Sequence, residues 1–115
     1  MAAYELVVLS NAAQDVDDAT VAQWYDGRHI PQVRAAVPGV GEVRRLRLAL
    51  PGSDGAPTSQ HRYLTSYEVE ADGPQDVLAA LGAGLADGRI EPGTVLDPAS
   101  MVVVVYEAAA SNSAR

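Results

Sequence analysis

The stretch Trp24-Tyr25-Asp26-Gly27-Arg28-His29-Ile30-Pro31 holds the only Trp of the chain, one of its two His and a proline. From about Asp18 the apolar residues follow a helical period, which predicts a helix. Pro31 disfavours the α conformation at the residue before it, so we expect a bend next to His29 and a second short turn over 32–36. This bend would turn the imidazole towards a cavity between helix and sheet.

Four further segments, 4–10, 40–50, 61–70 and 101–107, are rich in β-forming residues, and 51–60 has the composition of a loop. A second helix begins at Pro74 and ends before Asp87-Gly88. We expect its apolar stripe to consist of Val77, Leu78, Leu81 and Leu85. The order βαββαβ predicts an α+β, ferredoxin-like fold: a four-stranded antiparallel sheet with both helices on one face. We expect one domain over 1–107 and a flexible tail over 108–115.

The first and last strands are apolar on both faces, although the helices cover only one. Leaving Val103, Val105 and their neighbours in water would forgo about 1.5–3 kcal/mol for each large side chain. A second copy packed sheet against sheet would cover this surface. The pattern therefore predicts a homodimer.

The composition of the 115 residues excludes several functions. A net charge of −7 disfavours a nucleic-acid or anionic-membrane surface. The chain has no Cys, no signal-peptide pattern and no apolar run near the roughly 20 residues that cross a bilayer. We therefore expect a cytoplasmic protein with neither a nucleic-acid nor a membrane partner.

The spacing of several motifs resembles that of a known family. They are Asn11, Trp24-Tyr25-x-x-x-His29-x-Pro31, Val37-Pro38-Gly39, Arg44-Arg45 and Tyr67-Glu68. Together they are similar to small EthD-like members of the dimeric α/β barrel superfamily, over roughly residues 4–70. The resemblance implies the ferredoxin-like fold and the dimer. Its relatives include cofactor-independent monooxygenases, polyketide cyclases, a muconolactone isomerase and haem enzymes, so it does not fix the reaction.

His29 is the first catalytic candidate, because an imidazole titrates near neutral pH and suits proton transfer. The alternative is a histidine that caps the helix end. Asp26, three residues earlier, lies within reach along a helix and is a candidate to orient the imidazole. A plain surface carboxylate is the alternative for Asp26.

The remaining candidates surround the same pocket or belong to the hairpin. Trp24, Tyr25 and Tyr67 are expected as substrate-binding walls, with a purely structural core role as the alternative. Arg45 is the candidate that stabilises an anion, with Glu68 beside it on the next strand. A cross-strand ladder between Arg45 and Arg47 on one strand and Glu68 on the other is the alternative.

No metal site is expected, because the two imidazoles, His29 and His61, lie far apart in the sequence without carboxylates at ligand spacing. The sequence therefore predicts a small enzyme without a cofactor, acting by proton transfer on a hydrophobic, oxygenated, aromatic or polyketide-like molecule. Cyclase, isomerase, dehydratase and monooxygenase reactions all fit this scheme. A non-catalytic binding or accessory protein that uses the same pocket is the alternative.

Overall fold

The computed structural model describes residues 1–49 and 60–109. Most of the expected loop at 51–60 and of the expected tail at 108–115 lies outside these residues. The strands are β1 (Ala2–Ser10), β2 (Val40–Arg47), β3 (Tyr63–Ala71) and β4 (Val102–Glu107). The helices are α1 (Asp18–Trp24), α2 (Ile30–Ala36) and α3 (Pro74–Ala86). A π-helical turn, η1 (Tyr25–His29), joins α1 to α2, and a 3-10 turn, η2 (Pro98–Ser100), precedes β4.

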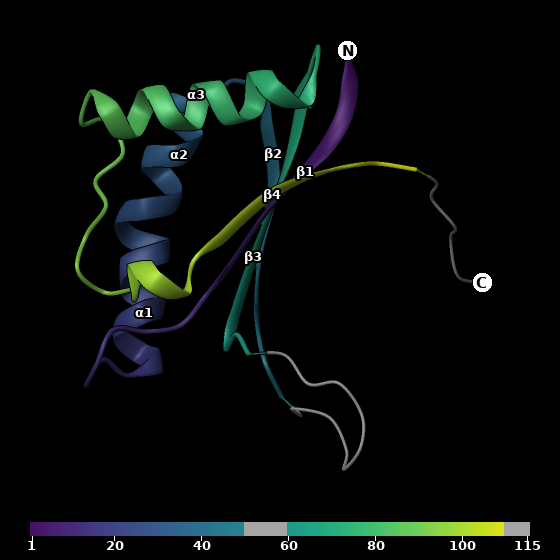
Figure 1. Ribbon diagram of the computed structural model, residues 1–115. Coiled ribbons are helices and arrows are strands. Elements are labelled where there is room, and N and C mark those ends of the chain that lie inside the picture. The colour runs from purple at the N-terminus through teal and green to yellow at the C-terminus, as the bar shows by residue number, and fades with distance from the viewer. Residues whose placement is uncertain (50–59, 110–115) are drawn as a thin grey trace.

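The four strands form one antiparallel sheet in the order β2-β3-β1-β4. Helices α1, α2 and α3 all lie on the same side of this sheet, and no helix of the described residues lies on the other side (Figure 1). The element order and this arrangement confirm the predicted ferredoxin-like α+β fold.

The strand register decides which residues face the helices. Leu6 of β1 lies opposite Tyr67 of β3 and Val105 of β4, and all three pack in the core under the helices. The expectation that Val103 and Val105 lie on the uncovered face is therefore wrong. Because side chains alternate along a strand, that face of β4 carries Val102, Val104 and Tyr106 instead. A run of four valines, Val102 to Val105, leaves this choice open in the sequence.

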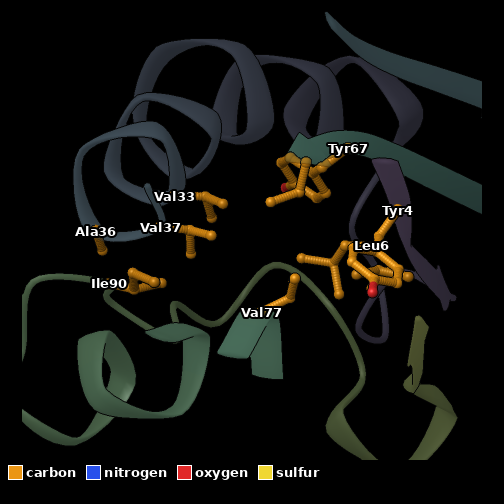
Figure 2. Packing of buried hydrophobic residues seen from close by; sticks show 10 residues of the cluster. Tyr4, Leu6, Val33, Ala36, Val37, Tyr67, Val77 and Ile90 are labelled. Carbon is orange, nitrogen blue, oxygen red and sulfur yellow. The ribbon is translucent and has the colours of Figure 1, made fainter. Parts of the chain in front are cut away.

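The main core fills the space between the sheet and the helices (Figure 2). Leu6 and Tyr67 from the sheet meet Val33 of α2, Val77 of α3 and Ile90, which follows α3. Each of these side chains is at most 1% exposed. Burying each one contributes about 1.5–3 kcal/mol, so this cluster fixes the helices on the sheet.

Helix α3 packs through a narrower face than its apolar stripe suggested. Val77 is buried, but Leu78 and Leu85 keep 45% and 44% of their surface exposed. Gly84 faces the core instead, and a Cβ at this position would lie 2.7 Å from Cδ1 of Ile90. The expected four-residue stripe is therefore only partly correct, since Val77 and Leu81 pack on the core and Leu78 and Leu85 do not.

Candidate functional site

Helix α1, the turn η1 and helix α2 form one continuous helical rod, which carries Trp24, Tyr25 and His29. The rod begins as expected near Asp18. The carboxylate of Asp17, the N-cap residue of α1, accepts a hydrogen bond from the backbone N–H of Thr20 at 2.8 Å. This bond pairs one of the backbone donors that a helix start leaves free. The rod then runs through η1 into α2.

The expected bend at Pro31 is absent, because the helix continues through the proline by a π-helical turn. Ile30 has φ −60° and ψ −46°, inside the α region, and its N–H donates to the carbonyl of Tyr25, five residues back. Proline lacks an N–H and its ring crowds the carbonyl four residues earlier. The extra residue in η1 moves that carbonyl away, and Pro31 lies in the first turn of α2, where its N–H is not needed.

The π-helical turn brings the aromatic rings of η1 and α1 together. The rings of Trp24 and His29, five residues apart, stack with centroids 4.4 Å apart and planes 15° from parallel. The ring of Tyr25 meets the edge of both, at 5.0 Å from Trp24 and 5.5 Å from His29. In a regular α-helix residues five apart do not share a face, whereas a π-turn aligns them. The helix geometry thus presents the imidazole to the interior.

His29 lies in the wall of a cavity between the helices and the sheet, which we call the apolar cavity. Its volume is about 240 Å³. The helical rod contributes Trp24 and His29 to its lining, and the sheet contributes Tyr67 and Val103. Leu81 and Leu85 of α3 close one side and Met101 lies at the start of β4. The expected cavity beside His29 is present.

Three residues of this lining each carry a buried polar atom. Nδ1 of His29, Nε1 of Trp24 and the hydroxyl of Tyr67 are buried and have no hydrogen-bond partner within the described residues. A buried polar group without a partner costs about 1–3 kcal/mol, so folded proteins contain few. Their gathering around one cavity is typical of a binding site.

Burial sets the protonation of these groups. It lowers the pKa of His29 from 6.5 to about 4, so the imidazole is neutral at pH 7. Burial, together with the nearby phenol of Tyr25, raises the pKa of Tyr67. The cavity therefore presents a neutral imidazole, which can accept a proton, and a protonated phenol, which can donate a hydrogen bond.

The structure does not bring Asp26 to the imidazole. Its two carboxylate oxygens accept hydrogen bonds from Nε and Nη2 of Arg45, at 2.9 and 2.8 Å. Arg45 lies on the helix side of β2, opposite Thr65, and is not part of the lining of the apolar cavity. This bidentate ion pair attaches η1 to β2, the edge strand of the sheet.

Tyr25, Tyr67 and Glu68 occupy three different positions. Tyr67 lines the apolar cavity, and Tyr25 packs behind the imidazole with only 1% of its surface exposed. Glu68 follows Tyr67 on β3 and therefore points to the opposite face of the sheet. Since Arg45 pairs in register with Thr65 on the helix side, the alternative of an Arg45–Glu68 ladder is wrong.

The residues that the sequence did not predict come from the connection between α3 and β4. Pro92, Gly93, Leu96 and Pro98 complete the lining of the apolar cavity. Gly93 has φ +67°, and a Cβ there would lie 2.7 Å from Nε1 of Trp24. A glycine between prolines in an irregular segment was the available signal, because such a glycine often permits a close approach.

Residues 1–49 and 60–109 hold no group of three or more His, Asp or Glu side chains placed to share a metal ion. In the same ranges, no helix has the length and apolar character needed to cross a bilayer.

Fold and site together define a small ferredoxin-like α+β protein with an apolar cavity between sheet and helices. The chain shares this fold with the crystal structure of an EthD-like protein from Ralstonia eutropha JMP134, with a TM-score of 0.64 and 18% identity over 100% of this chain and 99% of that one. It also resembles an ethyl tert-butyl ether D (EthD) family protein from Bacillus halodurans C-125, with a TM-score of 0.58 and 16% identity over 95% and 100% of the two chains. No protein-family model matches the sequence, and no curated protein matches it significantly.

Proposed function

We propose that this chain is a small EthD-like enzyme that transfers a proton without a cofactor. The observation that supports this most is the neutral imidazole of His29 in the wall of the apolar cavity, with the unpartnered hydroxyl of Tyr67 in the same lining. The similarity of fold to two EthD proteins agrees with the proposal.

The size and lining of the apolar cavity define the class of substrate. A cavity of about 150 Å³ accommodates benzene, so the 240 Å³ found here fits a molecule of one or two rings. Aliphatic side chains such as Leu81, Met101 and Val103 favour an apolar body, and the flat face of Trp24 favours a ring. The three buried polar atoms without a partner favour a substrate that carries a few oxygen substituents. The substrate is thus a hydrophobic, oxygenated, aromatic or polyketide-like molecule.

The first chemical step is proton abstraction next to a carbonyl group. The imidazole of His29 accepts the proton, and the bonding electrons move onto the carbonyl oxygen to give an enolate. Tyr67 donates a hydrogen bond to that oxygen. A developing negative charge beside the imidazole favours its protonated form, so the pKa of His29 rises as the reaction proceeds.

The same enolate leads to several products, namely a cyclised, isomerised or dehydrated molecule, or one oxygenated by dioxygen. Arg45 and Asp26 act here as positioning residues, because their ion pair holds η1 on β2. Tyr25 supports the imidazole from behind and Trp24 stacks on it. Glu68 has no part in the step, since it lies on the other face of the sheet.

An exchange experiment tests proton abstraction without knowledge of the natural substrate. The probe is 2-tetralone, a two-ring aromatic ketone, in D2O, and NMR follows the loss of its α-protons. The wild-type protein is expected to accelerate exchange, and H29Q to lose at least about tenfold of that acceleration. H61Q is the control, because His61 lies outside the apolar cavity. An H29Q protein that is folded and exchanges as fast as wild type contradicts the proposal.

One observation favours the second candidate function, a binding protein without turnover. A general base works best when its pKa lies near the working pH, and the pKa of His29 is lowered to about 4. The exchange experiment separates the two functions. If 2-tetralone binds to the wild-type protein with no acceleration of exchange, the binding function is the correct one.

The homodimer remains part of the proposal. The face of the sheet opposite the helices exposes large apolar side chains: Leu46 is 46% exposed, Val102 39% and Tyr106 60%. Contiguous exposed apolar surface usually marks an interface. A second copy that packs its own sheet on this face covers the surface of both chains. Sedimentation of the purified protein at micromolar concentration is expected to give twice the mass of one chain.

A further inference from the structure

A second cavity, which we call the polar cleft, opens between α1 and the end of the β2–β3 hairpin. Its volume is about 300 Å³, and its described lining shares no residue with that of the apolar cavity. Asp18, Tyr25, Arg45, Arg47 and Thr65 contribute its polar side chains. The substrate of proton transfer occupies the apolar cavity and not this cleft, although Arg45 and Tyr25 of the cleft lining also hold and support η1.

Two buried hydroxyl groups in the wall of the polar cleft have no partner. Thr65 has no exposed surface and Tyr25 is 1% exposed. Neither Oγ1 of Thr65 nor the hydroxyl of Tyr25 has a hydrogen-bond partner among the residues that the structure describes. Each can donate one hydrogen bond. Two such donors among the lining residues, Thr65 on β3 and Tyr25 in η1, favour a ligand that carries oxygen acceptors.

The charges around the polar cleft favour an anion. Asp18 accepts hydrogen bonds from Arg62 at 2.9 Å and from the hydroxyl of Tyr63, and it meets Arg47 only at 3.4 Å. Asp26 is occupied by Arg45. Three guanidinium groups therefore face two carboxylates, and the local charge is positive in a chain whose net charge is −7. Arg47 keeps most of its five N–H donors without a partner in the described residues.

The apolar part of the polar cleft selects among anions. Val21, Ala22 and the ring of Tyr25 form one wall, and the guanidinium carbon of Arg45 lies 6.0 Å from the centre of that ring. The guanidinium of Arg45 thus lies over the ring of Tyr25 at cation–π distance, and a ligand with an apolar body covers the apolar lining of the cleft, which a small inorganic anion leaves uncovered.

We propose that the polar cleft is a second binding site, which takes a small aromatic carboxylate. Arg47 and Arg45 hold the carboxylate, which is the planar acceptor that guanidinium groups match best. Thr65 and Tyr25 donate to oxygen atoms at the buried end of the cleft. The carboxylate and the substrate of proton transfer occupy different cavities, whose described linings share no residue.

The test uses benzoate as the probe and isothermal titration calorimetry at low salt. Wild-type protein is expected to bind benzoate at one saturable site per chain, and R47M and R45M to bind about tenfold or more weakly. T65V, which removes the hydroxyl and keeps the volume, is expected to bind several-fold more weakly. R44M is the matched control, because Arg44 pairs with Ser66 on the opposite face of the sheet and is expected to bind as wild type does.

Two further probes exclude general attraction of anions. Benzamide, which has the shape of benzoate without its charge, and inorganic phosphate, which has charge without a ring, are both expected to bind much more weakly. The proposal is overturned if wild type shows no saturable heat with benzoate, if R44M weakens binding as much as R47M, or if phosphate binds as tightly as benzoate. Exchange of 2-tetralone in R47M is expected to stay at the wild-type rate, so failure here is distinct from failure of the proposed enzyme.

Discussion

The imidazole of His29 lies face to face on the indole of Trp24, with the two ring centroids 4.4 Å apart. The residues are five positions apart, and only the π-helical turn η1 brings them onto one face of the helical rod. Pi-helical turns occur often at functional sites. The geometry of the candidate site therefore depends on one extra residue in a helix turn.

Replacing Pro31 by Ala tests the origin of this turn. Alanine restores the missing N–H, so the rod is expected to relax to a regular α-helix. Residues 24 and 29 then lie about 140° apart around the helix axis, which ends the stacking of His29 on Trp24. A crystal structure of P31A shows whether the rings separate, and 2-tetralone exchange is expected to fall at least about tenfold.

Pro74, in the first turn of α3, provides the control for that substitution. P74A is expected to leave the rings and the exchange rate unchanged. A P31A structure that keeps both the π-turn and the stacked rings means that the core, and not the proline, holds the turn.

The buried imidazole of His29 predicts a pH dependence of stability. The unfolded chain binds a proton at this residue below about pH 6.5, whereas the folded chain binds it only below about pH 4. The free energy of unfolding is therefore expected to fall as the pH is lowered from about 6.5 to 4, by roughly 3 kcal/mol in total from this group. Urea unfolding at several pH values measures it.

The variant H29Q isolates the contribution of His29, because every other titrating group is retained. Its free energy of unfolding is expected to change less with pH over the same window, by about the amount assigned to His29. Equal pH dependence in the two proteins means that the imidazole titrates alike in the folded and unfolded states. That result contradicts the burial of a neutral His29.

The geometry at Gly93, in the connection between α3 and β4, predicts that any side chain at this position lowers the free energy of unfolding. A Cβ at this position lies 2.7 Å from Nε1 of Trp24, and φ is +67°. G93A is expected to lose about 2–4 kcal/mol of unfolding free energy and to displace the indole. Thermal unfolding and Trp fluorescence measure the two effects.

A substitution at Gly88 measures the backbone contribution to this loss of stability without the contribution of a steric contact. Its φ is +85°, and a Cβ there would have no neighbour within 4 Å. G88A is expected to lose only about 1 kcal/mol and to leave the fluorescence unchanged. Equal losses in the two variants mean that the Trp24 contact contributes nothing.

The uncovered sheet face predicts where a charge disrupts the dimer. V104D introduces a carboxylate on the uncovered face of β4, within the proposed interface, where burying an unpaired charge is costly. The dissociation constant of the dimer is expected to rise at least about a hundredfold, as measured by sedimentation. A79D, the same kind of change on an exposed position of α3, is the control. A V104D protein that sediments like the wild type excludes this face as the interface.

The fold was largely predictable from the sequence, because the order of the helices and strands and the periodicity of their apolar residues determine it. The strands were placed within a few residues, and the sheet order follows from βαββαβ. Which valines of β4 face the helices was not predictable, since residues 102 to 105 are all valine. Only the pairing of β4 with β1 decides which of them lie on each face of the sheet. The turn at Pro31 was also not predictable, because a proline is compatible with a bend, a helix end or a π-turn.

The aromatic residues of the candidate site were predictable from the sequence, whereas the residues around them were not. Trp24, His29 and Tyr67 lie together in the apolar cavity, as the motif indicated. Asp26 was expected to orient the imidazole and Arg45 to stabilise an anion, but the two residues bond to each other. The extra residue in η1 rotates His29 away from the face of Asp26. The lining from Pro92 to Pro98 comes from an irregular connection, whose path no sequence period describes.

The most direct test of the central claim is a crystal structure of the protein soaked with 2-tetralone. The claim predicts the two-ring ketone inside the apolar cavity, with its ring system beside Trp24 and its carbonyl group within hydrogen-bond distance of Tyr67 or His29. A ketone found only elsewhere on a protein that still accelerates its exchange contradicts the claim that this cavity is where the proton is transferred.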